Sequence, residues 1–172
     1  SKGGIVLGVP YNSSAKYLRR AVDASLKRMG IDCIDLYQIH RPDFLGSPYG
    51  IAEVLTELRE NGKIREVGVS NYSPSQFRAL QAHFDFPIAT HQPEMSCLNY
   101  SALRDGVLDQ CMELGVTPLA WSPIAGGQLA MSIESAQQHP NGERLVRLLT
   151  VLDRIAEEQS VSRTSVALAW LM

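Results

Sequence analysis

Short apolar runs alternate with segments of helical periodicity along this chain, and this alternation constrains the fold more than any other feature. The runs cover residues 34–39, 63–69, 88–90 and 116–121. Between them, apolar residues recur three and four positions apart, as they do on the buried face of a helix. Strands that alternate with helices predict βαβ units and therefore a parallel sheet. The nearly unbroken apolar character of the runs is typical of strands covered on both faces.

Capping and breaking residues mark the predicted ends of the helices. Ser13 or Ser14 can cap a first helix, which Gly30 ends. Another helix begins at Ser73-Pro74, where proline occupies the first helical position. Further helices are predicted over residues 51–60, 103–114, 145–159 and from about 162 onward, and a long loop over residues 122–142.

Polar residues follow the apolar runs. His40 follows the first run, Ser70 and Asn71 follow the second, Gln92 closely follows the third, and Ser122 follows the fourth. Polar groups at the carboxyl ends of successive parallel strands are how a β/α barrel builds an active site. The sequence therefore predicts an enzyme. Because Ser70 and Asn71 together can hold an amide, we expect a flat, amide-bearing ligand.

Size and charge narrow the class of protein. A chain of 172 residues can bury a core, and we expect a single domain over residues 1–172. The net charge of −2 and the lack of a Lys/Arg cluster argue against nucleic acid or an acidic membrane surface as a partner. No apolar run approaches the ~20 residues of a membrane-spanning helix.

Cysteines and other ligand-forming residues give no sign of a metal or a disulfide. Cys33, Cys97 and Cys111 are far apart and form no C-x-x-C pair, so we expect buried, reduced thiols in a cytoplasmic protein. No His, Cys, Asp or Glu cluster has metal-ligand spacing, so we expect no metal. No glycine-rich phosphate motif of the G-x-G-x-x-G or G-x-x-x-x-G-K type follows any run, which weakens the rival fold, an open doubly wound sheet.

The segment from Arg65 to Tyr72, separated from Leu55 by nine residues, has a recognisable pattern. It reads as an aliphatic residue, a spacer, then basic-x-aliphatic-Gly-aliphatic-Ser-Asn-aromatic, and in this it resembles the aldo-keto reductases. The stretch from Asp35 to His40 and the stretch 122–124 fall in the family's order as well. The resemblance covers essentially the whole chain and implies an α/β fold of the (β/α)8 TIM-type barrel class. About five βα units of that barrel would lie in this chain.

The resemblance implies an oxidoreductase that reduces an aldehyde or ketone to an alcohol by hydride transfer from NADPH, with NADH as a possible substitute. The family's catalytic set is Asp, Tyr, Lys and His, and Lys2 and His40 would be the lysine and the histidine. No tyrosine of the chain falls at the family's acid position, so the Tyr and Asp would precede Ser1. A phenol of pKa ~10 is a poor acid near neutrality, and a lysine beside it stabilises the phenolate. The histidine would orient the substrate oxygen.

By the same resemblance, the cofactor contacts would follow three of the apolar runs: Ser70, Asn71, Gln92, Trp121, Ser122, Pro123, Ile124 and Gly126. The first three would hold the nicotinamide carboxamide, and the indole would stack on the nicotinamide ring. The serine at 122 and backbone N–H groups of the Gly126-Gly127 loop would hold the pyrophosphate. The family usually has Asn-Gln where this chain has His91-Gln92, and often Tyr or Phe in place of Trp121.

Simpler interpretations stay open at this point. Ser70-Asn71 can be a helix cap, Gly126-Gly127 an ordinary turn and His40 a structural residue. A nucleotide-binding regulatory subunit, like the β subunits of potassium channels, is a second function, which turnover of a generic aldehyde would distinguish. Another β/α-barrel enzyme with a phosphorylated substrate is a third, which nicotinamide fluorescence would distinguish. Because a closed barrel needs eight strands, we expect the 172 residues alone to be inactive.

Overall fold

The computed structural model describes residues 11–172, which form two compact units. Of the described residues, 11–92 and Asp109–Pro118 make up the sheet unit, and Pro93–Leu108 and Leu119–Met172 make up the helical unit. The expectation of a single domain over residues 1–172 stays a prediction.

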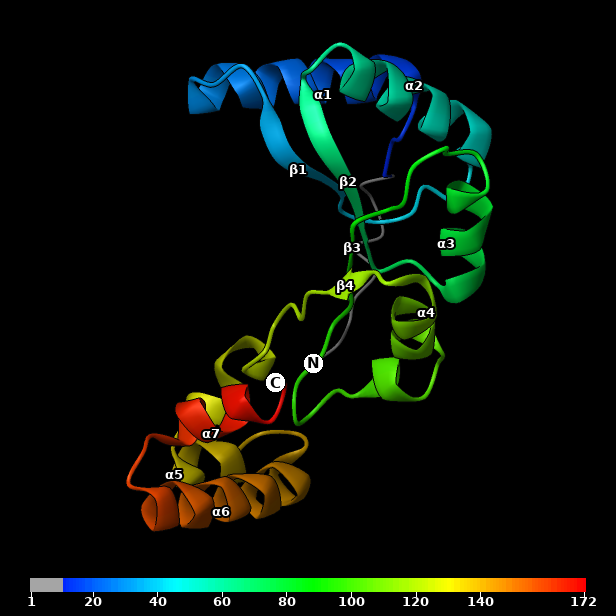
Figure 1. Cartoon of the computed structure of the whole chain (residues 1–172). Helices are drawn as coiled ribbons and strands as arrows, with labels where there is room; N and C mark the ends of the chain where they lie inside the picture. Colours follow the sequence, from blue (N-terminus) through cyan, green and yellow to red (C-terminus); the bar gives the residue numbers. More distant parts are fainter. Residues whose placement is uncertain (1–10) are drawn as a thin grey trace. The chain divides into compact units, whose positions relative to one another are not determined.

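A parallel sheet forms the centre of the sheet unit (Figure 1). Its strands lie in the order of the sequence, and each pairs in parallel with the next. Sequential parallel strands need a crossover between each pair, and the intervening helices provide it. The strands are β1 (Ile34–Ile39), β2 (Ile64–Ser70), β3 (Thr90–Gln92) and β4 (Thr117–Pro118).

The first three helices of the sheet unit begin at serine caps, and the sequence predicts the starts of the first and the third. The hydroxyls of Ser14, Ser47 and Ser73 accept backbone hydrogen bonds from the first turns of their helices. Gly30 ends the first helix in the left-handed conformation that glycine adopts without strain. The helices are α1 (Ala15–Met29), α2 (Pro48–Glu60), α3 (Pro74–Gln81) and α4 (Val107–Leu114).

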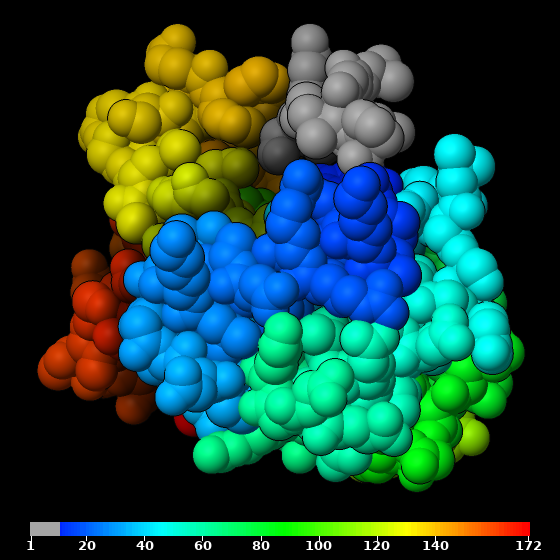
Figure 2. Space-filling view, turned by 90° about the horizontal axis from the view of Figure 1, so that it is seen from above, coloured from blue at the N-terminus to red at the C-terminus, as the bar shows by residue number. Residues whose placement is uncertain are grey.

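Helix α2 lies at the centre of the packing, since it contacts α1, α3 and β2. Residues of α1 and α2 form one continuous surface in the space-filling view (Figure 2). Beneath them, the aliphatic side chains of α2 pack against those of β2 and exclude water. Burial of this apolar area stabilises the unit by roughly 25 cal/mol per Å². The most deeply buried residues include Val54, Leu55, Leu58, Val67, Val69 and Phe77.

The helical unit has a core of its own. Its elements are η1 (Ser101–Leu103), η2 (Ala125–Ala130), α5 (Ile133–Gln137), α6 (Gly142–Gln159) and α7 (Arg163–Ala169). The side chains of Leu145, Leu149 and Leu152 line one face of α6 and meet Leu129 and Ala167. Helices α5 and α7 both pack against α6, which leaves its opposite, charged face to solvent (Figure 1).

An ion pair adds a polar anchor to the helical unit. Arg163 forms a two-point pair with Asp153, with N···O distances of 2.5 and 2.6 Å, and also donates to the carbonyl of Met131 at 2.6 Å. The Arg163 side chain is 18% exposed, so solvent screens the pair less than a surface pair. It therefore joins α6, the start of α7 and the segment that follows η2.

Some predicted boundaries are wrong. The helix predicted over 103–114 begins only at Val107, because η1 ends at Leu103 and Gly106, with φ 84°, directly precedes α4. The loop predicted over 122–142 contains η2 and α5, the latter capped by Ser132. Cys33 and Cys97 are half-buried, and only Cys111 is buried as expected. Among residues 11–172, no helix is long and apolar enough to cross a membrane.

Two strands also differ from their predicted ranges. The third strand is Thr90–Gln92 rather than 88–90, because its pairing with β2 runs from Gly68↔Thr90 to Ser70↔Gln92. The fourth strand keeps only two of its predicted residues. Pro118 has no N–H to donate, so the ladder stops there.

Candidate functional site

A hydrogen-bonded cluster occupies the carboxyl ends of β1, β2 and β3. The Asn71 side-chain amide donates to the backbone carbonyl of His40 at 3.1 Å and to the Ser70 hydroxyl oxygen at 2.8 Å. The Ser70 hydroxyl donates to the backbone carbonyl of Gln92 at 2.8 Å, and the Asn71 N–H reaches the same oxygen at 3.2 Å. The fold thus brings four predicted site residues together, and their roles stay predictions.

The backbone at the end of β2 is unusual. Asn71 has φ 60°, in the left-handed region that most residues avoid and that asparagine tolerates best after glycine. This turn directs the Asn71 amide back toward the strand it has just left, where it meets His40 and Ser70. Backbone strain of this kind is common at functional sites.

Gln92 has a side chain that is available to a ligand. It is half-buried, and its amide makes no hydrogen bond to any residue between 11 and 172 that the structure describes. A carboxamide ligand needs one donor and one acceptor opposite it, and a glutamine amide supplies both. The chemistry of Gln92 therefore fits the predicted contact with a nicotinamide carboxamide.

His91 belongs to the core rather than to the site. The sequence places His91-Gln92 after the third strand, and this is wrong, since both residues lie within β3. Side chains alternate across a strand, so His91 points to the face opposite Gln92. There it is fully buried, and its ring stacks on Phe77 with 5.6 Å between centroids.

His40 is exposed just after β1, beside a tyrosine that the sequence analysis did not select. The Tyr11 ring meets the His40 ring edge-on at 6.0 Å, and the Arg41 guanidinium lies 5.8 Å from the Tyr11 centroid. Residues 5–9 form another apolar run just before Tyr11. The rule that selected His40, a polar side chain after an apolar run, could have found this tyrosine too.

The loop after His40 is organised by one carboxylate. Asp43 accepts from the backbone N–H groups of Ser13 and Leu45, at 2.9 and 3.0 Å. Its backbone carbonyl accepts from Gly46 at 3.1 Å. These bonds hold the loop against the start of α1 and keep the exposed His40 at the end of β1.

Tyr72 follows the cluster directly but cannot serve as an acid. Burial raises the pKa of Tyr72 to about 12, and the negative charge of Asp43 adds to the effect. The phenol therefore keeps its proton at every physiological pH. The expectation that the catalytic tyrosine precedes Ser1 stays a prediction.

The remaining predicted cofactor residues lie in the helical unit. Trp121 donates its backbone N–H to the carbonyl of Pro93 at 3.0 Å, which extends the parallel pattern by one isolated bridge. Ser122 has φ 54°, and its hydroxyl accepts from the Gly126 N–H at 2.9 Å. Two protein groups that were predicted to hold the pyrophosphate, the Ser122 hydroxyl and the Gly126 N–H, are therefore hydrogen-bonded to each other. The same turn contains Pro123 and Ile124, both half-buried.

Glycines give the Ser122–Gly127 turn its shape. Gly126 and Gly127 have φ 61° and 92°, and a Cβ added at either would meet no atom within 4 Å. Glycine is favoured there by backbone conformation rather than by crowding. The open space beside these N–H groups is what a backbone loop near an anionic ligand requires.

Two further predictions concern Lys2 and a metal site. Lys2 lies outside the described residues 11–172. Within those residues, no three His, Cys, Asp or Glu side chains come together as a metal site would require.

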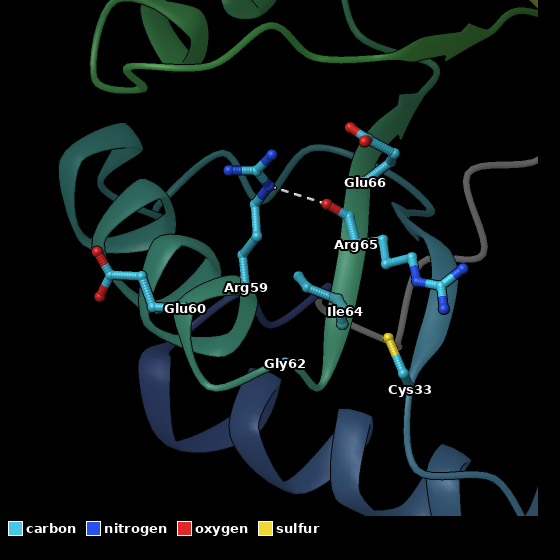
Figure 3. Close-up of a pocket in the computed structure, with 7 residues that line it drawn as sticks. All are labelled: Cys33, Arg59, Glu60, Gly62, Ile64, Arg65 and Glu66. Atoms are coloured by element: carbon cyan, nitrogen blue, oxygen red, sulfur yellow. Dashed lines mark hydrogen bonds between the residues drawn. The ribbon is translucent and has the colours of Figure 1, made fainter.

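A hollow of about 560 Å³ lies at the amino end of β2, among Cys33, Arg59, Gly62, Ile64 and Arg65 (Figure 3). The Arg59 side chain donates to the carbonyl of Arg65 at 2.9 Å, and its guanidinium covers the Phe86 ring at 4.4 Å. The hollow is shallow and opens at the end of the strand opposite to His40. We therefore place the candidate site at the carboxyl ends and not here.

Comparison with known proteins identifies close relatives. A profile of the Aldo/keto reductase family matches residues 2–172. The chain is 46% identical over 172 residues to 6-dehydroglucose reductase of Novosphingobium aromaticivorans, covering 100% of this chain and 54% of that protein. It is 30% identical over 177 residues to aldo-keto reductase yakc [NADP(+)] of Schizosaccharomyces pombe, covering 94% and 52%. The chain thus spans about half the length of these relatives.

A solved structure confirms the fold class. Glycerol dehydrogenase from Gluconobacter oxydans superposes with a TM-score of 0.84 at 28% identity, over 93% of this chain and 52% of that one. Together with the parallel sheet and its crossover helices, this confirms the predicted α/β barrel class. Four strands of the barrel lie within the described residues.

Proposed function

Because the chain belongs to the aldo/keto reductase family, we propose that it is part of an enzyme that reduces an aldehyde or ketone to an alcohol by hydride transfer from NADPH. The observation that carries this proposal is the cluster of His40, Ser70, Asn71 and Gln92 at the carboxyl ends of three adjacent strands. Active sites of β/α barrels are built at that end. Relatives that are named reductases support it further.

Cofactor binding is the first task of these residues. When bound, NADPH supplies the hydride. Gln92 would hold the nicotinamide carboxamide with its side-chain amide, and Ser70 and Asn71 would add polar groups beside it. Trp121 would stack on the ring, and Ser122 with Gly126 would face the pyrophosphate. The choice of NADPH over NADH is supported by a relative named for NADP(+).

Orienting the substrate oxygen is the task of His40. Once a carbonyl carbon has accepted a hydride, its oxygen carries negative charge and needs a hydrogen-bond donor. The imidazole of His40 is exposed at the strand end, where it can reach such an oxygen, and the Tyr11 ring restricts its rotation. Lys2 would support the proton donor by its positive charge.

The substrate is a small carbonyl compound. The relative with 46% identity is named 6-dehydroglucose reductase, so 6-dehydroglucose is the first substrate to test, with glyceraldehyde and a generic aldehyde beside it. We also propose a cytoplasmic location, which the three free cysteines support.

The test is a nicotinamide fluorescence titration of the intact protein, followed by NADPH consumption with each carbonyl compound. Binding and turnover are expected. Binding without turnover of any aldehyde would favour the regulatory-subunit alternative instead. Failure to bind NADPH and NADH would refute the proposed site.

A further inference from the structure

A second polar layer lies directly beneath the candidate site. Gln38, Gly68 and Thr90 stand opposite one another in the register of β1, β2 and β3. Two residues further along, the same three chain segments present His40, Ser70 and Gln92. Because residues two apart share a face of a strand, both layers face the same side of the sheet, about 7 Å apart.

One hydrogen bond spans this lower layer. The Thr90 hydroxyl donates to the Gln38 side-chain oxygen at 3.0 Å. β1 and β3 do not pair with each other, since each pairs with β2 between them. The bond therefore passes over β2 and ties together two strands that no backbone hydrogen bond joins.

Gly68 is the residue over which the bond passes. A Cβ added there would lie 2.2 Å from the Thr90 hydroxyl oxygen and 2.8 Å from Gln38 Cγ. Any side chain at position 68 would occupy the space that the bond uses. Glycine is thus required here by close approach of its neighbours and not by a positive φ.

We propose that Gln38 and Thr90 are positioning residues, which act through the strand ends above them. Their bond sets the separation of β1 and β3, and so the distance between His40 and Gln92. The inference rests on the proposed function, in which Gln92 holds the nicotinamide and His40 the substrate oxygen. Misplacement by about 1 Å at such a site can cost ~100-fold in rate.

Thr90→Val is the variant that isolates the bond, because valine keeps the shape of threonine and lacks the hydroxyl. It leaves the half-buried Gln38 side-chain oxygen without its hydrogen bond to position 90. We expect kcat/KM to fall ~10-fold and NADPH affinity to fall with it, since Gln92 lies on the same strand. Thr90→Ser, which restores the hydroxyl, should stay within ~3-fold of the unchanged protein.

Val67→Ala is the matched control. Val67 is fully buried in β2 next to Gly68, but on the opposite face of the strand. The Val67→Ala variant should lower the melting temperature as much as Thr90→Val does, and it should leave kcat and NADPH affinity unchanged. Equal kinetic loss in Val67→Ala and Thr90→Val would show that Thr90 is only structural, and would overturn the inference. So would a Thr90→Ser variant as impaired as Thr90→Val.

A second readout needs no turnover. In NMR spectra, Thr90→Val should shift the side-chain amide signals of Gln92 and the imidazole signals of His40, and Val67→Ala should shift neither. Unmoved signals in Thr90→Val would refute the inference. If the unchanged protein neither binds nicotinamide nor turns over a carbonyl, the proposed function fails, and this readout still decides whether the layer positions the two residues.

Discussion

Replacing Gly68 with alanine tests the packing beneath the candidate site most directly. The new Cβ would lie 2.2 Å from the Thr90 hydroxyl oxygen, whereas ordinary contacts begin at 3.4 Å. The hydroxyl must therefore retreat by about 1.2 Å, the difference between these distances, and its 3.0 Å bond to Gln38 is lost. Overpacking of this kind costs ~1–3 kcal/mol and the lost bond about 1 kcal/mol, so Gly68→Ala should lower the free energy of unfolding by roughly 2–4 kcal/mol.

Urea unfolding of the intact protein, followed by circular dichroism, measures this cost. Gly50→Ala is the matched control, because Gly50 lies in α2 with its nearest neighbour 3.9 Å from an added Cβ. That change should stabilise by ~0.4–1 kcal/mol. Thr90→Ala removes the nearer obstacle, so the double variant Gly68→Ala/Thr90→Ala should be more stable than the sum of the single changes indicates. A Gly68→Ala cost below about 0.5 kcal/mol, or strict additivity, would refute the packing argument.

Three further predictions address the site itself. His40→Ala should lower kcat/KM by ~100-fold with little change in NADPH affinity, and steady-state kinetics with unaltered turnover would remove His40 from the mechanism. Asn71→Ala and Gln92→Ala should each weaken NADPH binding by ~1–2 kcal/mol in a fluorescence titration, and the double variant should lose less than the sum of the two. If both single variants bind NADPH as tightly as the unchanged protein, the nicotinamide binds elsewhere. The pKa of Tyr72 is raised to about 12, so its stabilising contribution is complete below the unfolded phenol's pKa of about 10 and is lost as pH rises through about 12. Tyr72→Phe should therefore remove this alkaline loss of up to roughly 2–3 kcal/mol, and an unchanged stability profile above about pH 10 would contradict it.

Signals that act over a few residues are the ones that the sequence reveals. Ser14, Gly30 and Ser73 mark helix ends because a cap depends only on the first or last turn. The clustering of His40 with Ser70 is equally predictable, because carboxyl ends of parallel strands share one edge of the sheet. The hydrogen bond between Gln38 and Thr90 could not be predicted from the sequence, since it joins residues 52 positions apart and depends on the register of three strands.

The assignment of His91 and Gln92 shows how much depends on register. The pairs Val69↔His91 and Ser70↔Gln92 place the imidazole on the core side and the amide on the site side. A slip of one residue would exchange them, because alternate residues face opposite sides. The stacking of His91 on buried Phe77, at 5.6 Å between centroids, opposes that slip, since it would bring the Gln92 amide against an aromatic core. The core contact of His91 therefore fixes which face of β3 carries the Gln92 side chain, and this is the face on which we propose that the nicotinamide binds.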